Sequence, residues 1–376
     1  MSSTVTKQDP RYPVLCRGKN ARFPRADWDA VSRIEVCESA EDAADALQRA
    51  VRAGMRPTVR SGGHCYEDFV VNNPNGVILD VGMLSHTSSA PGGKGGYQIG
   101  PGTVLGVVYT ELYRKYNVSI PGGTCYSVAA GGHLSGGGYG LLTRLQGLSV
   151  DWLTAVDILT VEANGRVIKR HVNRHQDADL FRALRGSGGA NYGVITNFYF
   201  DRLPTAPRTL STAGVSFPWH SMTEEKFITI ARTYGEYFET RGKDPETWPM
   251  FTFMGLTHRD PDGRIGISAT WHDMDGMNDL SIPTEFLDRF VRCGDASSMI
   301  EAPVNSHQAT GRRAAELPPC VAGQHRYTTI PWIDGTIGSS WGRRQQREHT
   351  GEIQVLLHEE EFHCRRATQD VCATYT

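Results

Sequence analysis

Long apolar runs and an excess of either charge are missing from this sequence. The chain of 376 residues carries 39 Lys and Arg against 41 Asp and Glu, for a formal net charge of −2. Nucleic-acid binding needs a concentrated basic surface, so no such partner is expected. No segment reaches the roughly 18 consecutive apolar residues of a membrane span, and the stretch from Met1 to Arg11 lacks the apolar core of a secretory signal. These absences predict a soluble, cytoplasmic protein with no membrane partner.

Cysteine pairs and nucleotide-binding signatures are also missing. None of the 8 cysteines forms a CxxC pair, which argues against a zinc ribbon or a thioredoxin-type site. A disulfide framework is not expected in a cytosolic chain of this length. No Walker sequence occurs, and the segment from Gly188 to Gly193 does not match GxGxxG. His358 and His363 are five residues apart instead of four and miss a common helix face, so no metal site is predicted.

Glycine, in contrast, is abundant. The chain has 41 glycines, well above the usual share of about 7%. They concentrate in loops between Gly62 and Gly193, and they form no repeat. Glycine lets the backbone approach a neighbouring group closely, so this pattern predicts loops packed against something flat or phosphorylated.

The first half of the chain alternates between helix and strand patterns. Ser39 begins a helical pattern that runs to Met55, with apolar residues on one face and Gly54 at its end. An Asn164-Gly165 turn joins two strand patterns, from Leu153 to Glu162 and from Arg166 to Arg170. The other predicted elements are strands at 58–59, 77–81, 97–100 and 192–200 and helices at 103–116 and 179–185. This half is therefore predicted to be mixed α and β.

A second region follows three prolines, Pro204, Pro207 and Pro218. It contains an amphipathic helix from Glu224 to Phe238. A hairpin pattern follows, with strands at 250–257 and 264–271 and a turn from Asp260 to Gly263. Fewer glycines and more antiparallel pairing distinguish this region, so the complete chain is predicted to be an α+β protein of at least two domains.

His64 ends a glycine loop, Arg60-Ser61-Gly62-Gly63-His64. The glycines allow backbone N–H groups to approach a phosphate. A histidine in this position could bind a metal, act as a base or attach a cofactor. The alternative is an ordinary hydrogen-bonded loop histidine, and this loop alone leaves both interpretations open.

Cys125 lies in a second glycine loop, between Gly122-Gly123 and Gly131-Gly132. An isolated cysteine is usually a small buried apolar residue. The N–H groups of a glycine loop could instead stabilise a thiolate, which is a nucleophile. The second loop alone does not decide between these two roles.

Together the two loops resemble the vanillyl-alcohol oxidase superfamily. The resemblance rests on Arg-Ser-Gly-Gly-His, Pro-Gly-Gly-Thr-Cys, Gly-Gly-His-Leu-Ser-Gly-Gly-Gly-Tyr-Gly and Gly-Leu-Ser-Val-Asp. It is greatest for the berberine-bridge-enzyme-like group with doubly attached FAD. Within that group, the segment from Gly62 to Phe69 is most similar to bacterial sugar and glycopeptide hexose oxidases. The similarity is specific from Phe23 to Phe200 and looser as far as Trp341.

The resemblance implies covalent FAD, attached through the 8α-methyl to His64 and through C6 to Cys125. Arg60 to Gly63 would cradle the pyrophosphate. The complete set of further cofactor-binding residues that it implies is Arg60, Ser61, Gly62, Gly63, Cys65, Tyr66, Gly100, Pro101, Gly102, Pro121, Gly122, Gly123, Thr124, Gly131, Gly132, Gly136, Gly137, Gly147, Val194 and Ile195.

The implied activity is oxidation of an alcohol on a small or sugar-like substrate, with O2 as the acceptor and H2O2 as the product. Tyr139 falls where this group has an active-site tyrosine, which either exchanges a proton with the substrate or packs on the flavin edge. A flavin dehydrogenase and an inactive FAD-binding remnant are the alternatives. A hexose or amino sugar is the first substrate hypothesis, and an alkaloid- or polyketide-like molecule the second. The sequence does not indicate an oligomeric state.

The resemblance also implies the domain organisation. A PCMH-type FAD-binding domain of two α/β subdomains would occupy residues 23–205, and an antiparallel-sheet substrate domain residues 206–341. Complete members of the group have a further segment that returns to the FAD domain, and we expect that segment to be missing here. Residues 342–376 form an irregular tail, and one hypothesis is that this tail is translated out of frame.

Overall fold

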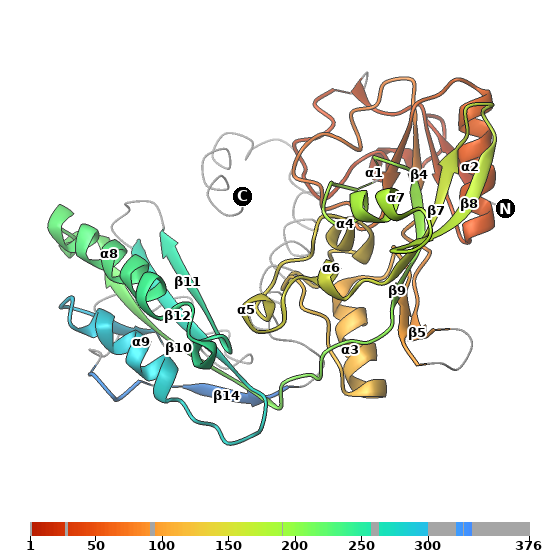
Figure 1. Cartoon of the computed structure of the whole chain (residues 1–376). Helices are drawn as coiled ribbons and strands as arrows, with labels where there is room; N and C mark the ends of the chain where they lie inside the picture. Colours follow the sequence, from red (N-terminus) through yellow and green to blue (C-terminus); the bar gives the residue numbers. More distant parts are fainter. Residues whose placement is uncertain are drawn as a thin grey trace. The chain divides into compact units, whose positions relative to one another are not determined.

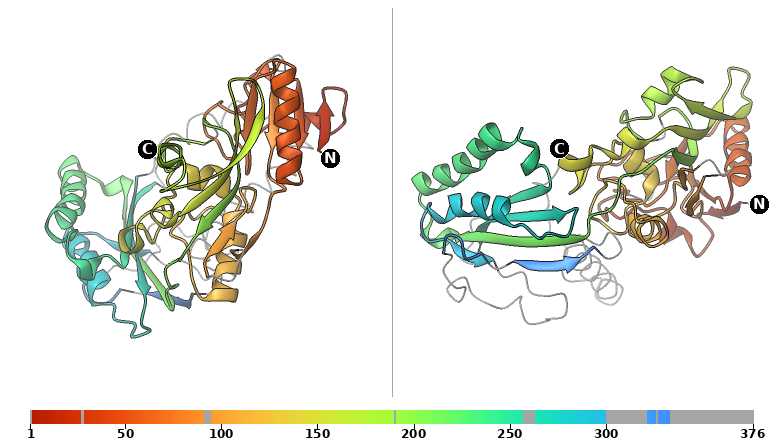
Figure 2. Two further views of the ribbon diagram at one scale, coloured as in Figure 1. Left: turned by 45° about the vertical axis from the view of Figure 1, so that its right-hand side comes forward. Right: turned by 60° about the horizontal axis from the view of Figure 1, so that its bottom comes forward.

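The computed structural model describes residues 2–26, 29–90, 95–189, 191–256, 263–299, 321–325 and 327–332. The described residues form two compact units, one ending at Ala206 and the other beginning at Pro207. Figures 1 and 2 show both units, and each is described here separately. The predicted tail at 342–376, with its out-of-frame hypothesis, and most of the predicted turn at 260–263 lie outside the described residues.

The first unit contains a four-stranded sheet in the order β1-β2-β4-β3. Strands β2, β4 and β3 are parallel, and β1 is antiparallel to β2. A short helix, α1 (Tyr12–Leu15), follows the first strand. The strands are β1 (Ser3–Thr6), β2 (Arg33–Val36), β3 (Pro57–Arg60) and β4 (Val77–Asp80). The sequence analysis predicted β3 and β4 and missed β1 and β2.

The predicted helix at Ser39 is α2 (Ala40–Arg52), which connects β2 to β3. The Ser39 hydroxyl accepts a hydrogen bond from the Asp42 amide at 3.0 Å, so the predicted cap is confirmed. The predicted apolar face is buried against the first sheet, through Ala43, Ala46, Leu47 and Ala50. The helix ends three residues earlier than predicted because Gly54 takes a φ of +63° and closes the last turn.

A second sheet in the same unit has the order β5-β6-β9-β7-β8, and its pairings are all antiparallel. Its strands are β5 (Thr87–Ser89), β6 (Tyr97–Ile99), β7 (Ala155–Val161), β8 (Val167–Asn173) and β9 (Val194–Phe200). The accompanying helices are α3 (Leu105–Tyr116), α4 (Ala130–Ser135), α5 (Thr143–Gln146), α6 (Ser149–Trp152) and α7 (Ala178–Ala183). Two sheets with helices therefore make up this unit.

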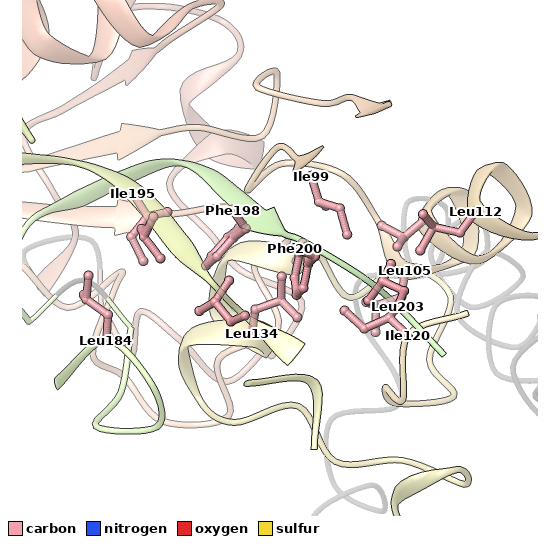
Figure 3. Close-up of a cluster of buried hydrophobic side chains, with 14 of the residues drawn as sticks. Ile99, Leu105, Leu112, Ile120, Leu134, Leu184, Ile195, Phe198, Phe200 and Leu203 are labelled. Carbon is pink, nitrogen blue, oxygen red and sulfur yellow. The ribbon is translucent and has the colours of Figure 1, made fainter. Parts of the chain in front are cut away.

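The core of this second sheet joins strand residues to helix residues (Figure 3). Phe198 and Phe200 of β9 are fully or almost fully buried against Leu105 and Leu112 of α3 and Leu134 of α4. This core fixes the first turns of α3 and α4, between which the predicted Cys125 loop lies.

The second unit is a five-stranded antiparallel sheet with two main helices. Its main path is β11-β12-β10-β13, and β14 also pairs with β10. Alternate residues of one sheet face, including Val215, Phe217 and Ile267, form one core with both helices. Figure 1 shows the helices beside the sheet. The elements are β10 (Thr209–Pro218), α8 (Glu224–Arg241), β11 (Met250–Leu256), β12 (Arg264–Asp273), α9 (Ser281–Val291), β13 (Ser297–Met299), β14 (Thr328–Pro331) and the 3-10 turns η2 (Trp219–Ser221) and η3 (Pro245–Thr247).

The predicted α+β class, with an antiparallel second region, is confirmed. Within the described part of the chain, no helix has the length and apolar character needed to cross a membrane.

Candidate functional site

The two predicted glycine loops are packed directly against each other. The first loop follows β3 and leads to His64, and the second leads from Cys125 into α4. A Cβ added to Gly62 would lie 2.6 Å from the amide nitrogen of Ala129 and 3.2 Å from the carbonyl oxygen of Ser127. A side chain at this position would overlap backbone, so glycine is required for the loops to meet.

One hydroxyl joins the two residues predicted to attach the cofactor. The Oγ atom of Ser127 lies 2.9 Å from Nε2 of His64 and 3.8 Å from Sγ of Cys125. Both predicted nucleophiles are therefore close to the same atom, although 61 positions separate them in the sequence. The sequence analysis did not identify Ser127, because a serine inside a glycine-rich loop carries no distinguishing signal.

Backbone hydrogen bonds to the start of α3 hold the Cys125 loop in place. The Leu105 amide donates to the Val128 carbonyl at 2.8 Å, and the Ala130 amide donates to the Thr103 carbonyl at 2.9 Å. A Cβ at Gly106 would overlap the ring of Tyr126, so this ring lies directly on the helix backbone. These contacts fix the backbone on both sides of Ser127.

Arg60, predicted to help cradle a pyrophosphate, has its guanidinium bound elsewhere. Nη2 lies 2.6 Å and Nε 3.1 Å from Oδ2 of Asp80, and Nη1 donates to the Arg17 carbonyl at 2.9 Å. Arg60 is only 6% exposed. Its side chain therefore fixes the start of the His64 loop to β4, and only backbone N–H groups of the loop would meet a phosphate.

The other predicted glycines divide into packed and open positions. A Cβ at Gly100 or Gly102 would lie 2.2 or 2.3 Å from a backbone carbonyl oxygen, and the Gly131 amide donates to the Pro101 carbonyl at 2.8 Å. At Gly132 and Gly137 an added Cβ would meet nothing within 4 Å. Packed glycines shape the loops, while the open ones leave backbone uncovered for a flat ring, so these residues fit a flavin.

His133 is a further member of this site that the sequence analysis quoted only as part of a motif. Its Nε2 accepts a hydrogen bond from the Gly123 amide at 3.0 Å. Burial lowers the pKa of His133 to about 4, because the protein interior disfavours the charged imidazole. The neutral ring is the form that can accept this bond. The Tyr109 hydroxyl donates to the Gly123 carbonyl at 2.7 Å and holds the other side of the same residue.

Tyr139 lies next to the second glycine loop. A Cβ at Gly123 would be 3.6 Å from the Tyr139 carbonyl oxygen, and the Tyr139 residue is 51% exposed. Partial burial raises the pKa of its phenol. The phenol is therefore protonated at neutral pH.

The remaining predicted residues lie in three kinds of environment. Tyr66 is 71% exposed, and Cys65 is partly exposed. The side chains of Val194 and Ile195 are buried in two different hydrophobic clusters, so only their backbone would reach a cofactor. The other predicted residues belong to the two glycine loops or to turns beside them: Ser61, Gly63, Pro121, Gly122, Thr124, Gly136 and Gly147.

A separate polar pocket of about 560 Å³ lies elsewhere in the first unit. Its lining includes His86, Asp157, Lys169 and Asn197, and it contains none of the predicted cofactor residues. No cluster of three metal-ligating side chains occurs among the described residues.

Residues 31–170, which include both glycine loops, match the FAD binding domain family. The aclacinomycin-N/aclacinomycin-A oxidase of Streptomyces galilaeus is 35% identical over 352 residues, which are 90% of this chain and 59% of that protein. Over most of its length the chain is thus similar to an FAD-linked oxidase, and its first unit contains the FAD binding domain. The chain spans about three fifths of the length of this relative.

Solved structures of related flavoenzymes share the fold of this chain. The glycopeptide hexose oxidase DBV29, solved with teicoplanin, superposes with a TM-score of 0.68 at 30% identity, covering 85% of this chain and 66% of that one. A glucooligosaccharide oxidase from Acremonium strictum, described with 6-S-cysteinyl, 8α-N1-histidyl FAD, gives a TM-score of 0.66 at 20% identity, covering 89% and 60%. At 20% identity, the similarity to the glucooligosaccharide oxidase concerns the fold alone.

Proposed function

We propose that this protein is an FAD-dependent oxidase whose flavin is covalently bound to both His64 and Cys125. The observation that carries the proposal is the shared contact of both side chains with the Ser127 hydroxyl, at 2.9 and 3.8 Å, inside the FAD binding domain. Two nucleophiles that meet at one atom could reach neighbouring positions of one small ring system. The doubly linked flavin of the glucooligosaccharide oxidase is a precedent for this chemistry.

The substrate we propose is an alcohol group on a hexose or amino sugar, either unattached or carried on a larger molecule. Support comes from the sequence resemblance to hexose oxidases and from the glycopeptide hexose oxidase that shares the fold. When bound, FAD accepts a hydride from the carbinol carbon and passes two electrons to O2, giving H2O2. Tyr139 would accept a hydrogen bond from the substrate hydroxyl at its phenol oxygen and pass the hydroxyl proton to solvent through its own O–H.

Three further groups prepare the site. Gly132 and Gly137 leave open backbone for the ring, and the Arg60–Asp80 ion pair holds the first loop in place. The neutral His133 fixes the Gly123 amide. Each group acts through position, so little has to reorganise when substrate arrives.

The first experiment measures colour and mass of the purified protein after acid precipitation. We expect a yellow pellet and one covalent FAD per chain. An oxygen electrode then tests hexoses, amino sugars and glycosides against a panel of polyketide alcohols, with peroxide measured in parallel. A colourless pellet from a protein that binds FAD reversibly would refute covalent attachment. Reduction of a dye acceptor without O2 consumption would make the enzyme a dehydrogenase.

A further inference from the structure

We propose that Ser127 is a positioning residue that selects the tautomer of His64 for flavin attachment. This inference rests on the proposed covalent linkage at His64. The starting observation is the 2.9 Å contact between Nε2 of His64 and Oγ of Ser127, which joins residues 63 positions apart. The contact directs Nε2 toward Ser127, and the proposed flavin bond would use the other ring nitrogen, Nδ1, as in the 8α-N1-histidyl FAD of the glucooligosaccharide oxidase.

The tautomer follows from what each nitrogen must do. A neutral imidazole carries its hydrogen on one nitrogen and a lone pair on the other. Attachment needs the lone pair on Nδ1, and therefore needs the hydrogen on Nε2. Ser127 Oγ favours this arrangement when it accepts the Nε2–H hydrogen bond.

A hydroxyl also suits the state after attachment. Once Nδ1 carries carbon, neutral Nε2 has no hydrogen and can only accept. Ser127 then rotates its O–H and donates to Nε2. A hydroxyl both donates and accepts, so one side chain satisfies the ring before and after the reaction. A carboxylate in its place could only accept and would lose its bond on attachment.

The overall reaction balances with the oxidant of the proposed function. A C–H bond of the flavin methyl and the N–H hydrogen of the imidazole are lost, and a C–N bond forms. The two electrons and two protons that are released reduce one O2 to H2O2. Ser127 contributes position and tautomer and is not consumed.

Backbone hydrogen bonds of the loop around Ser127 fix the position of its hydroxyl. The Val128 amide donates to the Cys125 carbonyl at 3.3 Å, which turns the chain and brings Oγ to within 3.8 Å of Cys125 Sγ. The Leu105 amide donates to Val128 and the Ala130 amide donates to Thr103, which fixes the chain after Ser127. The Gly106 amide donates to the Tyr126 carbonyl at 3.2 Å and fixes the chain before it. The position of the hydroxyl therefore depends on backbone contacts that a change at Ser127 leaves in place.

The test compares two variants of equal shape, Ser127→Thr and Ser127→Val, each combined with Cys125→Ala so that His64 is the sole attachment site. Apoprotein from riboflavin-starved cells is incubated with FAD in air, and covalent incorporation is followed by mass spectrometry. We expect the Thr variant to keep the rate of the Ser127 parent. The Val variant should be slower by about tenfold, as expected for the loss of one hydrogen bond. Circular dichroism and reversible FAD binding verify that both variants fold.

Two results separate the inference from the proposed function. Equal attachment rates for the Thr and Val variants, in a parent that does form the His64 linkage, would overturn the role of Ser127 alone. A parent with no covalent flavin at His64 would overturn the proposed linkage and the inference with it. NMR spectroscopy of the purified flavin peptide of the parent should place the bond on Nδ1, and a bond at Nε2 would also overturn the inference.

Discussion

The guanidinium of Arg60 and the carboxylate of Asp80 form a buried ion pair between the last residues of two parallel strands, with Nη2 and Oδ2 2.6 Å apart. Both side chains are mostly enclosed, at 7% and 15% exposure. Asp80 also accepts a hydrogen bond from the Gly82 amide at 2.9 Å, so one carboxylate organises the ends of β3 and β4. The loop that carries His64 begins directly after this pair.

Removal of Asp80 should strongly destabilise the protein. Asp80→Ala leaves the Arg60 guanidinium buried without its carboxylate, and breaking such a pair typically costs about 3–5 kcal/mol of unfolding free energy. Urea unfolding followed by fluorescence measures the loss. Asp45→Ala, which removes an exposed carboxylate from α2, is the matched control and should change stability by about 0.5 kcal/mol or less. Equal effects of the two variants would show that the ion pair does not hold the loop.

Single replacements of the two attachment residues should each leave one covalent bond. His64→Ala should retain flavin through Cys125, and Cys125→Ala should retain it through His64, because each residue is a nucleophile in its own loop. Denatured protein from either variant should stay yellow, and the double variant should release all its flavin. Covalent flavin in the double variant would mean that other residues carry the bonds.

Tyr139→Phe should preserve flavin binding and slow substrate oxidation. Loss of a positioned proton-transfer group typically reduces the rate by about 10²–10⁴-fold. Stopped-flow bleaching of the flavin without oxygen measures this step directly. Tyr192→Phe, which alters an exposed tyrosine, should keep the parental rate. If Tyr139→Phe bleaches as fast as the parent, the ring only packs against the flavin.

Gly132→Ala should separate folding from flavin binding. An added Cβ meets no protein atom within 4 Å, and Gly132 lies inside α4, so the methyl group should stabilise the fold by roughly 0.4–1 kcal/mol. The same methyl group would occupy space that we assign to the flavin, so incorporation of FAD should fall. Gly235→Ala changes an equally open position inside α8. This control should raise the unfolding free energy in the same way without lowering the incorporation of FAD. Unchanged flavin content in Gly132→Ala would place the ring elsewhere.

His133 should make the protein less stable as the pH falls from about 6.5 to about 4. Burial lowers its pKa in the folded state to about 4, so within this range the unfolded chain binds a proton that the folded chain does not. The contribution of His133 to the unfolding free energy is fully present above about pH 6.5 and is lost as the pH falls from about 6.5 to about 4. His133→Gln, whose side-chain oxygen can still accept from Gly123, should flatten this part of the pH profile. His272, whose pKa burial also lowers to about 4, should still contribute a slope in this window.

The sequence by itself determined the elements that depend on local contacts. The cap of α2 joins residues three positions apart, and the β7–β8 hairpin closes over a short loop in which Gly165 takes a φ of +79°. Such signals lie in adjacent residues and need no other part of the chain. The two glycine motifs likewise identified the loops of His64 and Cys125 and predicted the FAD binding domain that the family comparison finds.

Only the tertiary structure decided which distant residues meet. Strand β2 was missed although Arg33-Ile34-Glu35-Val36 alternates polar and apolar residues, because four residues are the shortest run in which alternation indicates a strand. Its pairing with β1 and β4 makes this segment a strand. The sequence predicted that Arg60 helps to bind a phosphate. In the structure its guanidinium forms a buried ion pair with Asp80, which lies 20 residues later. Ser127 has no sequence signal at all. Its importance comes from the packing of Gly62 against Ala129, which brings one hydroxyl between two nucleophiles.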